Sequence, residues 1–364
     1  MKFFNQSEIR NPKSEIGTAL NLPFLWPLGC LYGLGMRVRS ELYERSIFKR
    51  ATLPCRVISL GNLTLGGSGK TPATIWLSGY IRDRGKRVCI VSRGYKAQQT
   101  QSVGIVSDGR KLLLSPAAAG DEPFMMAKAL PGIPVLTGKK RFDAGMRAIQ
   151  AFQSEIIILD DAYQHLALNR DLNIVLLRTG RPFGNGYVFP AGILREPLSA
   201  LKRADAFVLT YAQEESASET ERQREFLERR FPGKPVFISH CRPTGFFYCG
   251  DQGQYDFAEL KGRKALAFCG IANPESFRST LAGSGLELVD FRAYQDHYGF
   301  QEQDLLDLEK RALACGAEIM ITTEKDAVKI SMYDERKLPT AALKTEFTFE
   351  PVFEEFISKH LEDL

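Results

Sequence analysis

A glycine-rich stretch, GNLTLGGSGKTP, occupies residues 61–72 and ends in the Gly-Lys-Thr triplet of phosphate-binding loops. The usual pattern has a glycine five residues before Gly69, where this chain has Thr64. A strand before the stretch and a helix after it supply the context that such a loop requires. We therefore predict a nucleotide site, rather than a tight turn alone, in which Lys70 contacts the β- and γ-phosphates and Thr71 coordinates Mg²⁺. The residues expected to cradle the nucleotide are Thr64, Gly66, Gly67, Ser68, Gly69, Lys70 and Thr71.

Carboxylates that could hold a metal follow an apolar stretch farther along the chain. Asp160 and Asp161 close the run EIIILDD, which begins at residue 155 and is typical of a buried strand. A carboxylate at the end of such a strand is a common partner of Mg²⁺ in P-loop proteins, directly or through water. A strand-terminating cap is the alternative, and the sequence leaves open which aspartate contacts the metal.

Charged groups that could act on an acceptor are less distinctive. Asp121 and Glu122 lie in the turn AAAGDEP before a helix, and taken alone this pattern favours an N-cap over catalysis. Arg141 ends the basic cluster GKKR, which is either a solvated face or a means of neutralising charge. Of the four histidines, His165 lies in the DDAYQH turn and His297 in YQDHYGF, where spacing alone assigns His297 no partner.

The elements that must position these residues follow an α/β pattern. Near-continuous apolar runs alternate with helical stretches, as expected for a parallel sheet covered on both faces. The predicted fold is a P-loop NTPase-like, doubly wound, mostly parallel sheet with a second, smaller α/β domain. Strands are expected at residues 55–62, 86–94, 155–161, 172–178 and 206–212, and helices at 71–85 and 216–231.

The second unit follows the same pattern. Residues 265–277 and 317–330 each read as strand, turn and helix, and residues 232–255 are the expected joint between the two units. The tail at 349–361 reads as an amphipathic helix. The predicted divisions are an N-terminal membrane-association helix at 1–36, a P-loop core domain at 37–235, a smaller α/β domain with its linker at 236–345 and a C-terminal helix at 346–364.

Composition and charge exclude several classes of protein. The 364 residues are 44% hydrophobic and 25% charged, which fits an ordinary globular protein. Seven cysteines form no CxxC pair, so we expect neither a zinc module nor a disulfide scaffold. This cysteine usage fits a protein of the reducing cytoplasm. Residues 1–56 hold nine Lys/Arg and four Asp/Glu, whereas the rest of the chain is neutral. Because this basic excess is not spread over a folded face, nucleic-acid binding is not expected.

The basic N-terminal region contains an apolar segment. Residues 16–36 carry no charge, but Asn21, two prolines and four glycines make a spanning helix a poor fit. We favour a helix lying in the membrane interface, with the flanking cations Arg10, Lys13, Arg37 and Arg39 near anionic headgroups. The alternative is a helix packed on the protein's own core. The side chains expected in the lipid are Phe24, Leu25, Trp26, Leu28, Leu31 and Tyr32.

Taken as a set, the motifs resemble one family. GNLTLGGSGKTP, SRGY, AGDEP, DDAYQH, GRPFGNGYVFPAGILREP, DHYGF and TTEKDAVK occur in the order seen in the tetraacyldisaccharide 4′-kinases, the lipid A kinases of Gram-negative bacteria. The similarity covers the chain from about residue 15, and Thr64 belongs to that family's own loop. One departure is Ala162, where the family pattern has glycine; it matters only if the turn needs a positive φ.

This resemblance implies transfer of the ATP γ-phosphate, with Mg²⁺, to the 4′-hydroxyl of a tetraacylated glucosamine disaccharide 1-phosphate. The product would be lipid IVA of lipid A biosynthesis, made at the cytoplasmic face of the bacterial inner membrane by a peripheral enzyme with no obligate protein partner. The resemblance implies that Asp121 is the base, supported by His297. Because phosphoryl transfer needs charge neutralisation, we expect Lys70, Mg²⁺ and Arg141 to neutralise the γ-phosphoryl group. The implied residues at the metal are Thr71, Asp160, Asp161 and Gln164.

Two other classes of function remain open on the sequence alone. A membrane-associated P-loop switch protein would need a base-specificity signature such as NKxD, which TTEKD does not supply, although Gln164 could position a water. A soluble small-molecule kinase would have no use for the apolar N-terminal segment.

Overall fold

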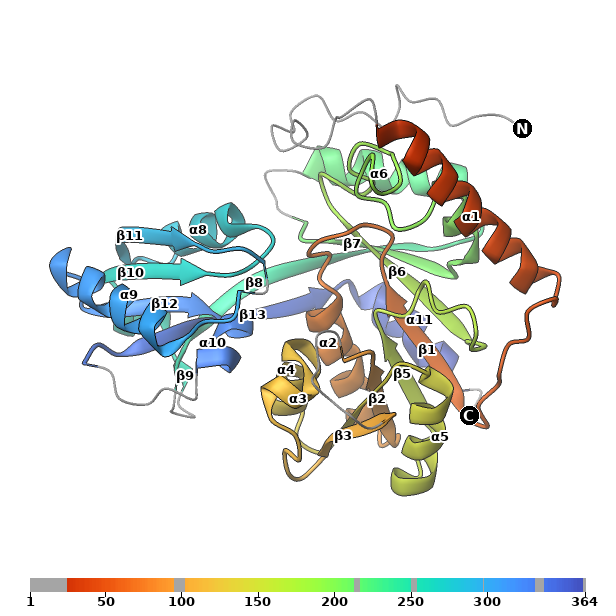
Figure 1. Ribbon diagram of the computed structural model, residues 1–364, viewed down its shortest axis with the longest axis horizontal. Coiled ribbons are helices and arrows are strands. Elements are labelled where there is room, and N and C mark those ends of the chain that lie inside the picture. The colour runs from red at the N-terminus through yellow and green to blue at the C-terminus, as the bar shows by residue number, and fades with distance from the viewer. Residues whose placement is uncertain are drawn as a thin grey trace.

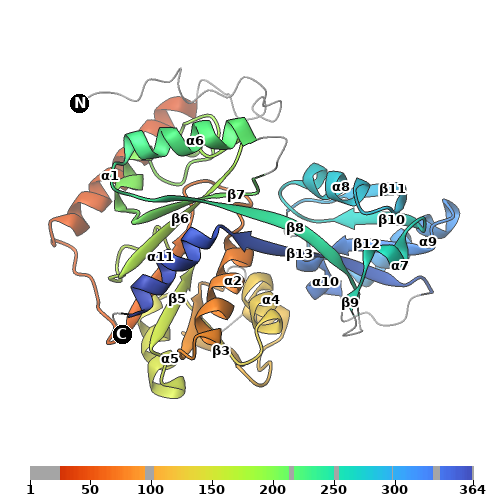
Figure 2. The ribbon, with the colours of Figure 1, turned by 180° about the vertical axis from the view of Figure 1, so that it is seen from behind.

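The computed structural model describes residues 25–94, 102–212, 217–249, 254–296, 298–330 and 337–362. In these residues the chain forms two lobes joined by two long strands (Figures 1 and 2). The strands are β1 (Arg56–Gly61), β2 (Val88–Ser92), β3 (Val103–Asp108), β4 (Pro134–Gly138), β5 (Ile156–Asp160), β6 (Leu172–Arg178), β7 (Ala206–Thr210), β8 (Val236–Tyr248), β9 (Gln254–Tyr255), β10 (Lys264–Cys269), β11 (Glu287–Ala293), β12 (Ile319–Thr323) and β13 (Thr340–Phe349). The helices are α1 (Trp26–Glu44), α2 (Lys70–Asp83), α3 (Pro116–Ala119), α4 (Asp121–Ala129), α5 (Arg141–Phe152), α6 (Ala217–Arg230), α7 (Phe257–Leu260), α8 (Pro274–Ala282), α9 (Glu302–Ala314), α10 (Glu324–Ile330) and α11 (Pro351–Glu362), with a 3₁₀ turn at Leu198–Arg203.

The strands form one continuous sheet in the order β11-β10-β12-β13-β8-β7-β6-β1-β5-β2-β4-β3, with β9 beside β8. Neighbouring strands are parallel except for β3 with β4, β8 with β13 and β8 with β9. The expected mostly parallel α/β fold is confirmed. The five strands predicted for the core are present as β1, β2, β5, β6 and β7, whereas β3 and β4 were not predicted.

We call β1–β7 with α1–α6 and α11 the P-loop lobe, and β9–β12 with α7–α10 the second lobe. Strand β1 lies between β5 and β6, so its carboxyl end is a point where the order of strands reverses, which is where α/β sheets bind ligands. In this register Leu60 pairs with Asp160, so the loop after β1 and the aspartates after β5 meet at one edge. Helices α2, α4 and α11 cover one face of the sheet, and α5 and α6 cover the other.

Strands β8 and β13 connect the lobes. The expected joint at residues 232–255 contains β8, which begins beside β7 and continues as a partner of β13 into the second lobe. The chain then returns through β13 and ends in α11, which packs on the P-loop lobe (Figure 2). The predicted divisions after residues 36, 235 and 345 stay predictions.

Helix α1 combines features of both interpretations of the apolar segment. Gly29 and Gly33 are buried, and a Cβ on Gly29 would lie 3.0 Å from Ala191, so the helix packs closely on the loop before Pro197. Its other side is exposed: Trp26, Leu28, Leu31 and Leu34 keep between 53% and 68% of their surface. The helix does not end at residue 36 but continues to Glu44, and residues 1–24, including Arg10, Lys13 and Phe24, lie outside the described residues. Within the described ranges no helix has the length and hydrophobicity needed to cross a membrane.

Candidate active site

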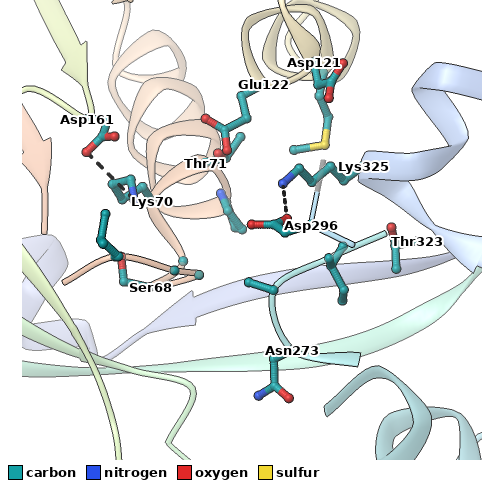
Figure 3. Close-up of a pocket in the computed structure, with 18 of the residues that line it drawn as sticks. Ser68, Lys70, Thr71, Asp121, Glu122, Asp161, Asn273, Asp296, Thr323 and Lys325 are labelled. Carbon is teal, nitrogen blue, oxygen red and sulfur yellow. Dashed lines mark hydrogen bonds and ion pairs between the residues drawn. The ribbon is translucent and has the colours of Figure 1, made fainter. Parts of the chain in front are cut away.

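A cavity of about 1830 Å³ lies between the two lobes. Its P-loop-lobe wall contains the loop 65–72 and residues at the end of β5 and the starts of α4 and α5, and its second-lobe wall contains residues of α8 and α10. Figure 3 labels Lys70 and Asp121 on the first wall and Lys325 on the second. The cavity brings together most of the predicted site residues. Those that line it are Gly66, Gly67, Ser68, Gly69, Lys70, Thr71, Asp121, Arg141, Asp160, Asp161 and Gln164.

Two positions of the loop require glycine, because of their backbone conformation and, at one of them, because of the space available. Gly66 has φ +104° and Gly69 has φ +77°, in the region that L side chains rarely adopt. A Cβ on Gly69 would also lie 2.6 Å from the ring of Phe347, on the connecting strand β13. The loop is therefore shaped by its own backbone and by the strand that joins the lobes.

The outside of the loop is held by the ends of neighbouring strands. Thr210 donates from its hydroxyl to the Ser68 carbonyl at 3.0 Å, and Arg178 donates to the Gly67 carbonyl at 3.2 Å. The buried Ser68 hydroxyl has no hydrogen-bond partner in the described residues. A buried polar atom of this kind requires a partner, and the phosphates of a nucleotide would supply one.

Thr64 is the one predicted nucleotide residue that does not line the cavity. Thr64 is 7% exposed and forms an isolated antiparallel β-bridge with Leu194. Its backbone carbonyl accepts a hydrogen bond from the side-chain amide of Asn62 at 2.7 Å. Its place is at the entrance of the loop, where it shapes the backbone. Lys70 begins α2, so the positive end of that helix faces the cavity.

Asp160, at the end of β5, is almost completely buried in the cavity wall. Its two carboxylate oxygens accept from the Thr74 hydroxyl at 3.3 Å and the Ser92 hydroxyl at 3.1 Å. Burial, with the charges of Glu122 and Asp161, raises the pKa of Asp160 to about 7. A buried carboxylate beside two others favours a bound cation, which would return the group to its charged form.

Asp161 is held by cations. Its carboxylate accepts two hydrogen bonds from one nitrogen of Arg195, at 2.8 and 2.9 Å, and lies 3.9 Å from the Lys70 ammonium (Figure 3 shows this last ion pair). Burial would raise the pKa of Asp161, but Lys70 and Arg195 outweigh it and the pKa is lowered. Asp161 has φ +46°, and Ala162 is not among the positive-φ residues. The departure at Ala162 therefore costs the turn nothing.

The turn after the aspartates is tied to β1 and to α1. The Gln164 amide donates to the Asn62 carbonyl at 2.9 Å, and the Gln164 backbone carbonyl accepts from Arg39 at 3.2 Å. Arg39 thus contacts the DDAYQH turn of its own chain, and its contact with headgroups stays a prediction. The Tyr32 hydroxyl donates to the Arg195 carbonyl at 3.2 Å, and both residues line the cavity, so α1 forms part of its wall.

Basic side chains gather at the same side. Arg141 is 2% exposed, donates to the Gly138 carbonyl at 2.7 Å, and has its pKa lowered to about 10, mainly by burial. Burial, followed by the charges of Arg141, Arg170, Arg39 and Arg93, lowers the pKa of His165 to about 4. Arg141 is therefore not part of a solvated face, and the cavity wall here attracts anions.

Asp121 is the first residue of α4, and Gly120, with φ +90°, is the N-cap. The carboxylate is partly exposed and lies 3.7 Å from the ammonium of Lys329, which belongs to α10 in the second lobe. Asp121 thus lies at the contact between the lobes. His297 lies outside the described residues, and its neighbours Asp296 and Tyr298 line the cavity.

The residues present fit Mg²⁺ without forming a dedicated cage. The described part of the chain contains no group of three or more His, Cys, Asp or Glu side chains arranged as metal ligands. Mg²⁺ in P-loop enzymes takes only one or two protein oxygens, since water and substrate phosphates supply the rest. The Thr71 hydroxyl and the Asp160 carboxylate, both buried in this wall, suit that demand.

Three residues of the site were given no site role from the sequence, although Glu122 was noted beside Asp121 at a helix start. Arg195 orients Asp161, Glu122 adds a third negative charge near Asp160, and Lys329 contacts Asp121. Each lies in a motif that was quoted for its resemblance, so the motifs themselves were the available signal. Their partners are far away in the sequence and could not be read from spacing.

A glycine-rich loop at the end of a central parallel strand, facing two aspartates of the next strand, defines a P-loop nucleotide-binding protein. The model of one family, described as "Tetraacyldisaccharide-1-P 4'-kinase", matches residues 22–362. The chain belongs to the tetraacyldisaccharide 4′-kinase family.

Individual relatives agree with this assignment. The chain is 40% identical over 343 residues to a tetraacyldisaccharide 4′-kinase of Syntrophus aciditrophicus, covering 91% of each chain. It is 42% identical over 334 residues to the one of Desulfotalea psychrophila, covering 92% of this chain and 95% of that one. Among solved structures, LpxK from Aquifex aeolicus in complex with ATP is 34% identical, with a TM-score of 0.75 and coverage of 93% of this chain and 98% of that one.

Proposed function

We propose that this protein transfers the γ-phosphoryl group of ATP to the 4′-hydroxyl of a tetraacyldisaccharide 1-phosphate. The observation that carries the proposal is that Asp121, a carboxylate outside the nucleotide loop, lines the same cavity as Lys70 and Asp160. A nucleotide-binding switch has no need of such a group, whereas a kinase needs one to accept the proton of its acceptor. The relatives and the solved structure bear names that agree with this activity and with ATP.

The nucleotide end of the site would act by position and charge. Backbone N–H groups of the loop, the Ser68 hydroxyl and Lys70 would bind the phosphates. Mg²⁺ would be held by Thr71 and one of the pair Asp160 and Asp161, with Gln164 beside them, and would supply charge neutralisation on the β- and γ-phosphoryl oxygens. Arg141 would add positive charge at the transferred group.

At the acceptor end, Asp121 would accept the proton of the 4′-hydroxyl. The 4′-oxygen forms a bond to the γ-phosphorus while the bond from that phosphorus to the β–γ bridging oxygen breaks, and ADP leaves. An ordinary carboxylate is a weak base for a sugar hydroxyl. We propose that His297, which the sequence places between two cavity-lining residues, supports Asp121 in this role.

The acceptor is a lipid, so the enzyme must meet a membrane. The exposed apolar side of α1 supports binding to the surface of the bilayer, and Tyr32 of the same helix lines the cavity. We place the enzyme at the cytoplasmic face of the inner membrane, where ATP is present and anionic lipids attract the exposed Arg37.

The test is incubation with γ-labelled ATP and Mg²⁺, with and without tetraacyldisaccharide 1-phosphate. Label should appear in the lipid, at the 4′ position, and only when the acceptor is present. Release of labelled phosphate at the same rate with and without the lipid would instead indicate a switch-type hydrolase. Transfer to a water-soluble acceptor would indicate a small-molecule kinase.

A further inference from the structure

Lys329 is a lysine of the second lobe whose side chain is only 8% exposed. It lies in the last turn of α10 and reaches across the contact with α4, where its ammonium lies 3.7 Å from the Asp121 carboxylate. Lysine is rarely buried this deeply without a specific partner, because removing its charge from water is costly.

The ammonium is fixed on its own side by the second lobe. It donates to the Asp326 carboxylate at 2.9 Å and to the Tyr298 carbonyl at 3.0 Å, and lies 6.0 Å from the centre of the Phe300 ring. An ammonium group has three donors, so two are occupied within the lobe and one remains for Asp121.

Asp326 is itself immobilised. Its side chain is fully buried and accepts from the Gly270 backbone N–H at 2.8 Å and from the Thr323 hydroxyl at 2.7 Å. The position of the Lys329 ammonium is therefore set by the backbone of the second lobe, through two strand ends and the loop that contains Tyr298.

We propose that Lys329 is a positioning residue, which holds the Asp121 carboxylate in the orientation from which it accepts the proton of the acceptor hydroxyl. The proposal rests on the proposed kinase function. At 3.7 Å the pair attracts through charge without a short hydrogen bond between the two groups. Because each lobe supplies one member, Asp121 is oriented only when the lobes face each other as they do here.

Lys329 has a purely structural alternative, which is to neutralise the buried Asp326. The test must separate the two roles. Lys329→Gln keeps a hydrogen-bond donor for Asp326 and for the Tyr298 carbonyl while removing the positive charge. Lys329→Arg keeps the charge. Lys310→Gln is a matched control, because Lys310 also pairs with an aspartate three residues away, in the same lobe, but is 74% exposed.

In the tetraacyldisaccharide assay, Lys329→Gln should lower kcat about 10- to 100-fold, the range expected when a reacting group loses its alignment. The KM for ATP should change less than about twofold, since no loop residue is touched. Lys329→Arg should recover part of kcat, and Lys310→Gln should match the wild type. In an Asp121→Asn background, Lys329→Gln should cost less than about twofold, because its target is already lost.

An equal loss in the wild-type and Asp121→Asn backgrounds would overturn the proposal, as would a Lys329→Gln enzyme at full kcat. A raised KM for ATP at unchanged kcat would make Lys329 a nucleotide ligand instead. If Lys329→Gln does not fold, the same cycle is run with Lys329→Arg. Melting temperatures of the four proteins in the cycle test the pair without turnover. If the Tm losses of the two single variants simply add in the double variant, the contact between Lys329 and Asp121 is contradicted. If the wild type phosphorylates no lipid, the proposed function is refuted but the contact is not.

Discussion

Lys70 connects the nucleotide loop to the aspartates of the next strand, because its ammonium lies 3.9 Å from Asp161. Lys70→Ala removes the cation expected on the β- and γ-phosphates, and a contact of this kind is typically worth about 3 kcal/mol in the transition state. We expect kcat/KM to fall at least about 100-fold in the labelled-ATP assay. Turnover above about a tenth of the wild-type value would contradict the phosphate-cradle interpretation.

Asp121 and His297 are predicted to act as one unit. If so, Asp121→Ala, His297→Ala and the double variant should lose similar amounts of kcat, with ATP affinity nearly unchanged. The measurement is single-turnover transfer to the lipid acceptor with each variant. Losses that multiply in the double variant would mean that the two residues act independently.

The residues of the site differ in how far the sequence predicts them. The nucleotide loop and the Asp160–Asp161 pair could be placed because each follows a strand, and strand ends meet at one edge of a parallel sheet. Arg195 and Lys329 could not be placed, because their partners Asp161 and Asp121 are set by the folding of distant segments. The local sequence pattern around each residue does not predict such long-range contacts.

The start of α10 contains a group that responds to pH. Glu324 accepts from the Thr345 hydroxyl on β13 at 3.3 Å, and burial raises its pKa to about 7 from an ordinary value of 4.5. The folded state therefore binds a proton more tightly than the unfolded state, so the contribution of Glu324 to stability falls as pH rises from 4.5 to about 7.

Glu324→Gln removes this dependence. The variant should gain stability relative to the wild type on going from pH 4.5 to pH 8, by about 2 kcal/mol after allowance for partial exposure. Urea unfolding at both pH values measures the difference. If the difference in unfolding free energy between the variant and the wild type is the same at both pH values, the pKa of Glu324 is not raised.

Helix α1 is the element on which membrane binding is expected to depend. Leu31 and Leu34 are 68% and 57% exposed on the side away from the buried glycines. Replacing both with serine should weaken sedimentation with anionic vesicles at least about tenfold, since each leucine carries about 1.5 kcal/mol or more of transfer free energy. The melting temperature should not change.

A matched control for α1 lies on the second lobe. Leu306 and Leu313 are 38% and 49% exposed on α9, and serine at both positions should leave vesicle binding unchanged. Equal effects of the two pairs would mean that exposed leucine in general, rather than α1, determines the association.

At the level of elements, the buried strands were the best predicted part of the fold. Their apolar runs are long and nearly continuous because helices cover both faces. Strand β4 has the same burial and length as β5, but its sequence PVLTG has only two consecutive apolar side chains between a proline and a glycine. Strand β3 is only partly buried and pairs with β4 in the opposite direction, so neither strand gave a clear pattern. The continuation of α1 to Glu44 was missed because its last two turns are charged and amphipathic.

The stability of the whole molecule depends on helix α11, which lies far from the P-loop in the sequence. Phe353 of α11 is 1% exposed, with its ring centre 5.7 Å from Trp76 of α2 and 5.0 Å from Phe237 of β8. Phe353→Ala should cost about 3–5 kcal/mol of unfolding free energy. Urea titration measures this loss, and Val352→Ala, at a site 60% exposed on the same helix, should cost less than about 0.5 kcal/mol.

The return of the chain through β13 to α11 also sets an order of events during synthesis. The second lobe, between β8 and β13, is contiguous, so its hydrophobic cluster can close once β13 has left the ribosome. The P-loop lobe is made first but lacks Phe353, Ile357 and Leu361 of its core until residues 351–362 emerge. A nascent chain stalled before residue 351 would therefore carry the whole nucleotide loop and still expose the face of the sheet that α11 covers. We expect such a chain to bind chaperones before it can act as a kinase.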